Sequence, residues 1–262
     1  MEWFEALILG IIQGLTEFLP VSSSGHLEIG KVLLGIETTE NITFTVVVHG
    51  ATVLSTIVIF RKDIWLLIKA LFLFKWNDDT KYIAKLFISA IPVAILGFLF
   101  KDEIESLFTG NLVLVGAMLI ITALLLGFTS IAKERQKNIP FLDAIIIGIA
   151  QAVAVMPGIS RSGATIATGI LLGNKKENVA KFSFLMVLMP IIGANLKDIL
   201  DGTMASESIS ATPLIIGFLA AFISGLLACK LMIEIVKRSK LIYFAIYCLI
   251  IGIVAISAVM FF

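Results

Sequence analysis

Six long apolar segments constrain this chain more strongly than any other feature of its sequence. A helix needs about 20 predominantly apolar residues to cross the hydrocarbon core of a bilayer. The segments that meet or approach this length are residues 41–60, 81–100, 112–131, 182–198, 212–232 and 241–261. Hydrophobic residues make up 59% of the chain and charged residues only 15%, against about 25% charged in soluble domains. We therefore predict an integral membrane protein.

Three further apolar segments are short or interrupted. Residues 1–36 are broken at Pro20, residues 141–173 are broken at Pro157–Gly158, and residues 63–75 are too short to span and carry Lys69. Open strand edges are not tolerated in lipid, and the alternating pattern of a membrane β-barrel is absent. We therefore predict one all-α membrane domain that comprises residues 1–262.

The two interrupted segments resemble each other at a constant offset of 138 residues, from Ser22 to Ser160. The matched positions are Gly10, Gln13, Ser22, Ser24, Gly25, Leu33–Gly35 and Phe44 in the first, and Gly148, Gln151, Ser160, Ser162, Gly163, Leu171–Gly173 and Phe182 in the second. Because SxSG and its flanking residues match without a gap, the sequence predicts an internal repeat, with copies at about 1–131 and 139–262.

Loop charge predicts which helix ends face the cytoplasm. Basic residues outnumber acidic ones in residues 61–85, 133–140, 174–181 and 230–240, and acidic residues outnumber basic ones in 1–5, 37–40, 101–111 and 197–211. Cytoplasmic loops of membrane proteins are the basic ones, so we assign the acidic stretches to the outside. Residues 1–36 then start and end outside, while residues 141–173 start and end inside. Each of these segments must enter the membrane and return as a hairpin.

The predicted fold is thus an inverted-topology repeat of six transmembrane helices plus two re-entrant helical hairpins. Because the hairpins enter from opposite sides, their tips, residues 20–26 and 157–164, are expected to meet near the bilayer midplane. Broken helices that meet in this way are familiar from transporters.

The first hairpin carries polar residues where they are costly. They are Gln13, Glu17, Ser22, Ser23, Ser24 and His26. A carboxylate near the bilayer centre costs roughly 2.5–3.5 kcal/mol on insertion scales, so Glu17 indicates a functional site. Gln13 lies one helical turn before Glu17 and shares its face. Glu17 and His26 can move protons, and a serine beside such a base can attack phosphorus.

The second hairpin carries the sequence PGISRSGAT, residues 157–165. Arg161 is the one basic residue in the apolar segment 141–173, and Ser160, Ser162 and Thr165 surround it. The N–H groups at the start of a helix bind anions, and the planar guanidinium suits phosphate. The two tips together therefore predict an anion clamp opposite acid–base and nucleophilic groups.

Structural explanations compete with these functional ones. Serines in such a place can simply cap the following helix, and Glu17 with Arg161 can be a structural buried pair. A hydrogen bond common to Gln13 and Gln151 would explain both glutamines by the repeat. His49 is more typical of a satisfied histidine between helices than of a catalyst.

Two smaller features also have structural readings. Glu28 and Lys31 are one turn apart beyond the first tip and are expected to pair, without a catalytic role. Pro92 and Pro190 are expected to mark helix kinks.

At both tips the sequence resembles the undecaprenyl-diphosphate phosphatase family, whose members are also known for bacitracin resistance. The residues that carry the resemblance are QGLTEFLPVSSSGH at 13–26, which fits the family's (E/Q)xxxE motif and its serine–histidine continuation, and PGISRSGAT at 157–165, which fits PGxSRSxxT. Length, hydropathy and motif spacing also agree, so the likeness covers essentially the whole chain.

The resemblance implies a multi-pass enzyme of the bacterial plasma membrane. Such an enzyme hydrolyses undecaprenyl diphosphate to undecaprenyl phosphate and inorganic phosphate, which recycles the lipid carrier for peptidoglycan synthesis. It also implies roles for single residues. Ser23 matches the nucleophile, His26 the proton-transfer group, and Glu17 the second motif carboxylate. Ser160, Arg161 and Thr165 match the phosphate-binding set, and Gln13, Ser22, Ser24 and Ser162 are expected to assist in binding the substrate.

The resemblance further implies a divalent cation, expected to be Mg²⁺, near the diphosphate. Gln13 matches the first position of the (E/Q)xxxE motif in its Gln form, so Glu17 would supply the negative charge alone. In this scheme Arg161 grips the diphosphate. Ser23, deprotonated through His26 or Glu17, attacks phosphorus or positions a water that does.

Other function classes receive less support. The net charge of +1 does not indicate a surface that binds nucleic acid. The two cysteines, Cys229 and Cys248, lie in apolar runs without the spacing of metal ligands. A transporter or flippase of an anionic lipid is the rival reading, because inverted repeats are transport architecture. A homodimer is compatible with the sequence, which does not determine the oligomeric state.

Overall fold

The computed structural model describes residues 1–35, 42–100, 103–104, 106–107, 110–132, 137–200, 210–238 and 240–261. Their helices are α1 (Trp3–Phe18), α2 (Ser23–Leu34), α3 (Ile42–Ile59), α4 (Arg61–Phe72), α5 (Asp78–Leu99), α7 (Leu112–Phe128) with the 3-10 turn η2 (Thr129–Ile131), α8 (Phe141–Val153), α9 (Arg161–Leu171), α10 (Lys176–Met186), α11 (Leu188–Leu200), α12 (Ala211–Lys237) and α13 (Ile242–Phe261). Pairing of extended backbone in these residues is limited to one bridge between Lys137 and Asn174. The all-helical prediction is confirmed.

Five stretches of the described residues are long and apolar enough to span a bilayer: α5, α7 with η2, α10 with α11, α12 and α13. A sixth is obtained when α3 is counted together with α4, which follows it after a bend of 79°. Five of the six predicted spans are therefore found, and the sixth, residues 41–60, corresponds to α3, which qualifies only together with α4. Helix α4 covers most of the segment 63–75, which was predicted to be too short to cross.

One predicted span differs from a simple reading of hydropathy in its start and in its continuity. The span predicted at 182–198 begins earlier, at Lys176, and breaks at Val187 between α10 and α11. Pro190 explains the break, because it has no N–H to donate to Met186 one turn before it. Helix α5, by contrast, continues through Pro92 to Leu99.

Both predicted hairpins are present, and the same serine hydrogen bond caps their second helices, although the cap residue has a φ of 71° at Ser22 and −74° at Ser160. Ser22 is the N-cap of α2, where its Oγ accepts from the N–H of Gly25 at 3.2 Å. Ser160 is the N-cap of α9, where its Oγ accepts from the N–H of Gly163 at 3.0 Å. These are matched positions of the sequence repeat, so the local structure is consistent with it.

The long-range packing also follows the predicted repeat. Helix α1 packs along α12, and α8 packs along α5, so each hairpin is held by a helix from the other copy. Small residues allow the close approach. A Cβ at Gly10 would lie 2.5 Å from the carbonyl oxygen of Gly217, and one at Gly148 would lie 2.5 Å from that of Ser89.

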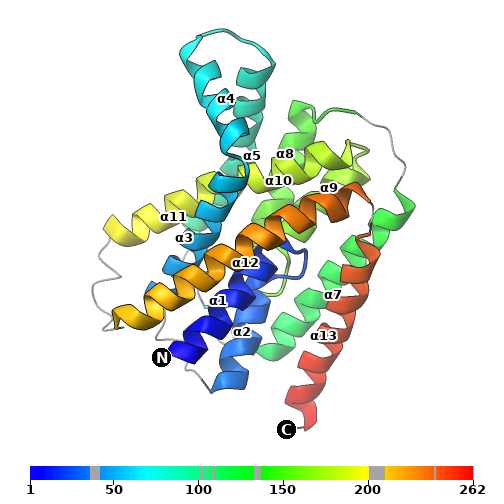
Figure 1. Ribbon diagram of the computed structural model, residues 1–262. Coiled ribbons are helices and arrows are strands. Elements are labelled where there is room, and N and C mark those ends of the chain that lie inside the picture. Colours follow the sequence, from blue (N-terminus) through cyan, green and yellow to red (C-terminus); the bar gives the residue numbers. More distant parts are fainter. Residues whose placement is uncertain are drawn as a thin grey trace.

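The described parts of the basic stretches lie at one end of the molecule, which is consistent with the loop-charge assignment. Lys181 on α10 pairs with Asp63 on α4, and Lys237 at the end of α12 pairs with Glu177. Figure 1 shows α4 and the start of α10 at the upper end, with the two chain termini at the lower end. The hairpin α1–α2 enters from the lower end, and α8–α9 from the upper end.

Candidate active site

The two hairpin tips meet inside the molecule. Ser162 Oγ donates to the carbonyl oxygen of Leu19 at 3.1 Å, which ties the start of α9 to the end of α1. A Cβ at Gly25 would lie 3.1 Å from Cα of Gly158, so the backbones of the two tips are in direct contact. Gly158 itself adopts a φ of +96°, which favours glycine at this turn. The predicted meeting of the tips is confirmed.

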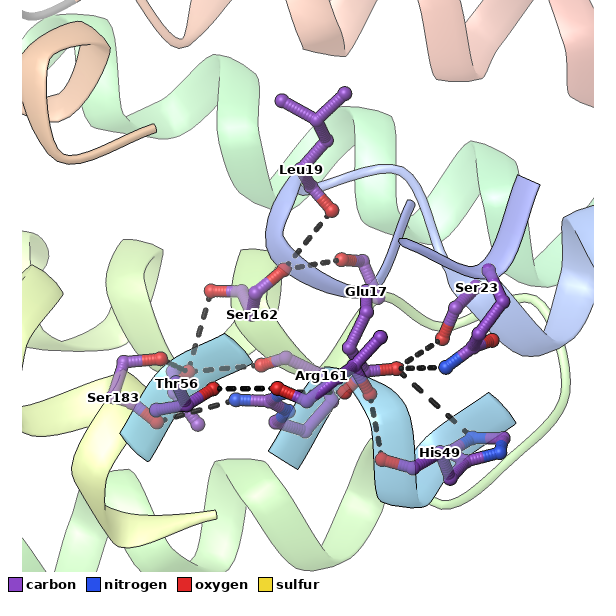
Figure 2. Close-up of polar contacts among 12 residues, drawn as sticks. Glu17, Leu19, Ser23, His49, Thr56, Arg161, Ser162 and Ser183 are labelled. Atoms are coloured by element: carbon purple, nitrogen blue, oxygen red, sulfur yellow. Dashed lines mark hydrogen bonds and ion pairs between the residues drawn. The ribbon is translucent and has the colours of Figure 1, made fainter. Parts of the chain in front are cut away.

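Glu17 lies at the centre of this contact, with its side chain only 8% exposed. Its Oε1 accepts from Arg161 Nη2 at 2.6 Å. Its Oε2 accepts from Ser23 Oγ at 2.8 Å and from Gln13 Nε2 at 3.0 Å. Figure 2 shows Ser23, His49 and Arg161 gathered around this carboxylate. One buried carboxylate therefore joins the predicted nucleophile to the predicted anion clamp.

Arg161 is held by both of its terminal nitrogens. Besides the bond to Glu17, its Nη1 donates to the carbonyl oxygen of Ser183 on α10 at 3.2 Å. Thr165, one turn further along α9, bonds to the Ser183 hydroxyl at 2.6 Å and donates to the Arg161 carbonyl oxygen. A guanidinium has five N–H donors, so a fixed Arg161 still has donors for an anion.

The serines around the two tips are largely engaged in capping. Ser22 and Ser160 cap α2 and α9, and each lies 3.3 Å, Oγ to Oγ, from the serine two positions later, Ser24 or Ser162. The N–H of Gly163 is bonded to Ser160, and the N–H of Ser160 to Thr122. Of the four N–H groups of residues 160–163 at the start of α9, those of Arg161 and Ser162 have no hydrogen-bond partner in the described part of the chain and are available to phosphate.

His26 does not face Ser23 or Glu17. Its Nδ1 lies 2.9 Å from the carbonyl oxygen of Ser22, and its Nε2 lies 2.8 Å from the hydroxyl of Tyr247 on α13. The imidazole and the Tyr247 ring are stacked with centroids 5.6 Å apart. In this arrangement Glu17, and not His26, is the group within hydrogen-bonding distance of the Ser23 hydroxyl.

His49 on α3 is a site residue that sequence reasoning assigned to a structural role. Its Nδ1 lies 2.8 Å from the carbonyl oxygen of Thr45, and its Nε2 lies 4.0 Å from Glu17 Oε2. The bond to Thr45 satisfies one ring nitrogen and aims the other at the carboxylate. Ser183 was also missed. The sequence offered a clue to His49, because a histidine inside an apolar span is unusual. It offered no clue to Ser183.

The explanation of Gln13 and Gln151 by a common hydrogen bond is wrong. Gln13 donates to Glu17, but the matched position in the second hairpin is Val155, which offers no acceptor. Neither polar atom of Gln151 has a hydrogen-bond partner in the described part of the chain, and Gln13 Oε1 has none either. Both side chains are buried. Both copies of the repeat therefore have the glutamine, but only the first copy has a carboxylate that accepts a hydrogen bond from it.

Glu28 and Lys31 form the expected pair, with Lys31 Nζ 3.8 Å from Glu28 Oε1. Glu28 Oε2 also accepts from the N–H of Gly110 at 2.9 Å, which holds the start of α7 against α2. The pair supports the fold away from the tips. Cys229 and Cys248 are free and buried, as expected of small core residues.

The donor set of the site limits the metals that it could hold. Among the described residues no three His, Cys, Asp or Glu side chains lie close enough to form a metal centre. Mg²⁺ is commonly held by one or two carboxylates together with substrate phosphates. Glu17 and the unpartnered Gln13 Oε1 are hard oxygen donors that fit this mode.

Comparisons with known proteins agree with the whole-chain resemblance. The family model described as bacitracin resistance protein BacA matches residues 6–254. An undecaprenyl-diphosphatase of Bacteroides fragilis is 58% identical over 260 residues, which cover 98% of each chain. One from Parabacteroides distasonis is 58% identical over 261 residues, again 98% of each chain. One from Carboxydothermus hydrogenoformans is 40% identical over 260 residues, 97% of this chain and 96% of the relative.

Proposed function

The chain belongs to the bacitracin resistance protein BacA family, and we propose that it acts as an undecaprenyl-diphosphatase at the site where its two hairpin tips meet. In this reaction, undecaprenyl diphosphate is hydrolysed to undecaprenyl phosphate and inorganic phosphate. The enzyme is a multi-pass protein of the bacterial inner membrane, where this lipid is its substrate and the recycled carrier serves peptidoglycan synthesis.

The observation that supports this position of the active site is that both oxygens of the Glu17 carboxylate form hydrogen bonds. Its two oxygens contact Ser23 from the first hairpin and Arg161 from the second, at 2.8 and 2.6 Å. Phosphoryl transfer depends mainly on positioning and on stabilising charge at the phosphoryl oxygens. A base, a hydroxyl and a guanidinium held together by one buried carboxylate provide both.

Glu17 is the proton acceptor in the proposed first step. Ser23 Oγ loses its proton to Glu17 Oε2 and forms a bond to the terminal phosphorus. The bond between that phosphorus and the bridging oxygen breaks, and undecaprenyl phosphate leaves. A water then attacks the phosphorus of the phosphoserine, and the bond from phosphorus to Ser23 Oγ breaks. Glu17 returns its proton to Ser23 Oγ, which restores the hydroxyl and the carboxylate, and inorganic phosphate leaves with the oxygen and protons of the water. In the alternative that the sequence left open, Ser23 positions a water that attacks directly.

Arg161 binds the phosphoryl oxygens in either version. Its guanidinium neutralises the charge that develops on them, together with the N–H groups of Arg161 and Ser162 at the start of α9. Thr165 holds Ser183, which accepts a bond from Arg161 and so keeps the guanidinium in place. His26, bonded to Tyr247, stays a predicted proton-transfer group, while Glu17 takes the role toward Ser23 that the sequence left open between the two.

Mg²⁺ is a proposed cofactor with a limited role. Glu17 and Gln13 Oε1 would hold it together with the diphosphate oxygens. When bound, it supplies further neutralisation of phosphate charge. The steps assigned to Ser23, Glu17 and Arg161 are derived from the contacts of this chain alone.

Phosphate release from undecaprenyl diphosphate by the purified protein in detergent tests the proposal. We expect turnover that Arg161→Ala abolishes and that EDTA lowers if Mg²⁺ acts. Ser23→Ala separates the two nucleophile schemes, since an obligatory phosphoserine requires complete loss of turnover. Folded, monodisperse protein that releases no phosphate would contradict the function and favour lipid transport. Light scattering on the same sample determines whether the protein forms the homodimer with which its sequence is compatible.

A further inference from the structure

Helix α4 and the residues that follow it expose large apolar side chains at the basic end of the molecule. They are Trp65, Leu71, Phe72, Leu73, Phe74 and Trp76. Phe72 is 74% exposed, Trp76 66% and Phe74 93%. Ala70 is the one fully buried side chain of α4. This surface, called the α4 surface below, is uncovered by the described part of the chain.

The geometry of α4 separates it from the spans. Its 12 residues are too few to cross the hydrocarbon, and it turns by 79° from α3. If α3 crosses the bilayer, a helix at nearly a right angle to it runs close to the plane of the membrane surface. Ile64 and Leu67 pack against the core of the protein, which fixes the remaining sides of α4 outward.

Cationic side chains accompany the apolar ones. Arg61, Lys62, Lys69 and Lys75 are all exposed on this segment. The ammonium of Lys69 lies 5.3 Å from the centre of the Trp65 ring, so charge and aromatic surface are presented together. In the described residues, Lys62, Lys69 and Lys75 form no ion pair with a carboxylate, whereas Lys181 and Lys237 at the same end do.

We propose that the α4 surface is an interfacial anchor that inserts its aromatic side chains among the headgroups of the leaflet at the basic end and binds anionic phospholipids with its lysines. An amphipathic helix with exposed aromatic residues and lysines has the composition of such anchors. Tryptophan is favoured at the headgroup level, and each nearby lysine attracts anionic lipid. The proposal is independent of the reaction at the hairpin tips.

The tryptophans of the chain provide a selective probe. There are three, Trp3, Trp65 and Trp76. Trp3 begins α1 at the opposite end, so in Trp3→Phe all tryptophan fluorescence comes from the α4 surface. This variant is reconstituted into vesicles whose phosphatidylcholine carries bromine, a quencher, either near the headgroup or near the chain ends. We expect shallow bromine to quench at least about twofold more strongly than deep bromine.

Three results would contradict the proposal that the α4 surface lies among the lipid headgroups. Unquenched emission typical of water would place α4 outside the lipid. Unquenched but blue-shifted emission would show a protein partner, such as a second copy. Stronger quenching by deep bromine would show insertion into the hydrocarbon.

Mixed vesicles test the lipid class. They contain equal amounts of phosphatidylglycerol and phosphatidylcholine, with bromine on one or the other. Brominated phosphatidylglycerol should quench at least about twofold more, and Lys62→Gln, Lys69→Gln and Lys75→Gln together should remove the difference. The matched control replaces three exposed lysines elsewhere at the same end, Lys175, Lys230 and Lys240, by Gln. A difference that persists in the first variant, or vanishes equally in the control, would refute anionic-lipid binding by this surface.

Discussion

Replacing Glu17 by Gln tests the centre of the site, because the change keeps the size of the side chain and removes its charge. Arg161, Ser23 and Gln13 all donate to the carboxylate. An amide has one acceptor oxygen, so its NH₂ group must face at least one of these donors. The Arg161 side chain is only 15% exposed, and a buried charge that loses its partner costs about 3–5 kcal/mol. Loss of the proton acceptor should lower turnover by about 10²- to 10⁴-fold.

The stability and the catalytic effects can be separated by a double variant. With an unfolding entropy of about 2.1 cal/mol/K per residue, 3–5 kcal/mol corresponds to a fall in Tm of roughly 5–9 °C for Glu17→Gln. Arg161→Gln should lower Tm similarly by leaving the carboxylate unpaired. The combination Glu17→Gln with Arg161→Gln removes both charges, so its loss of stability should be clearly smaller than the sum of the two. Its turnover should stay at the level of the worse single variant.

Thermal unfolding and phosphate release, measured on the same purified samples, check these expectations. Turnover by Glu17→Gln within tenfold of the parent protein, at an unchanged Tm, would refute the role of the carboxylate both as base and as partner of Arg161. Stability losses that simply add in the double variant would show that the two charges are not coupled.

Three further predictions concern single contacts. Arg161→Lys removes about two charge-assisted hydrogen bonds, each worth about 1.5–3 kcal/mol. The value of kcat/KM for undecaprenyl diphosphate should therefore fall by about 10²- to 10⁴-fold, and near-normal kinetics would exclude bidentate binding of the diphosphate by Arg161. Ser160→Ala leaves the N–H of Gly163 without its cap and should cost about 1 kcal/mol, seen as a Tm lower by about 2 °C; an unchanged Tm would mean that the cap adds nothing to stability. Gly148→Ala places a Cβ 2.5 Å from the Ser89 carbonyl oxygen and should reduce the yield of folded protein, whereas Gly97→Ala, with open space around it, should not; equal yields would contradict tight packing of α8 on α5.

The hairpins could be predicted because their signals are local. Pro20 ends the first helix, and the two SxSG sequences provide a serine cap and a small residue one turn later at both tips. The meeting of the tips then followed from loop charge and from the number of crossings. Glu17 and Arg161 were identifiable because charged residues are rare in such apolar segments.

The fine geometry of the site could not be predicted because it depends on packing between distant helices. His49 reaches Glu17 because α3 packs beside α1. His26 is close to Ser23 in sequence, yet its ring is taken up by Tyr247, more than 200 residues away along the chain. The early start of α10 was missed for another reason. Four of the six residues 176–181 are charged or polar, and a hydropathy window detects the apolar part of a helix, not the polar turns that precede it.

The matching starts of α2 and α9 have a consequence for how such a site can change over evolutionary time. The residue after each cap occupies the same place in the same hydrogen-bonded turn, but it is Ser23 in one hairpin and Arg161 in the other. A duplicated frame therefore lets one copy specialise in nucleophilic attack and the other in holding charge, while neither turn has to be rebuilt.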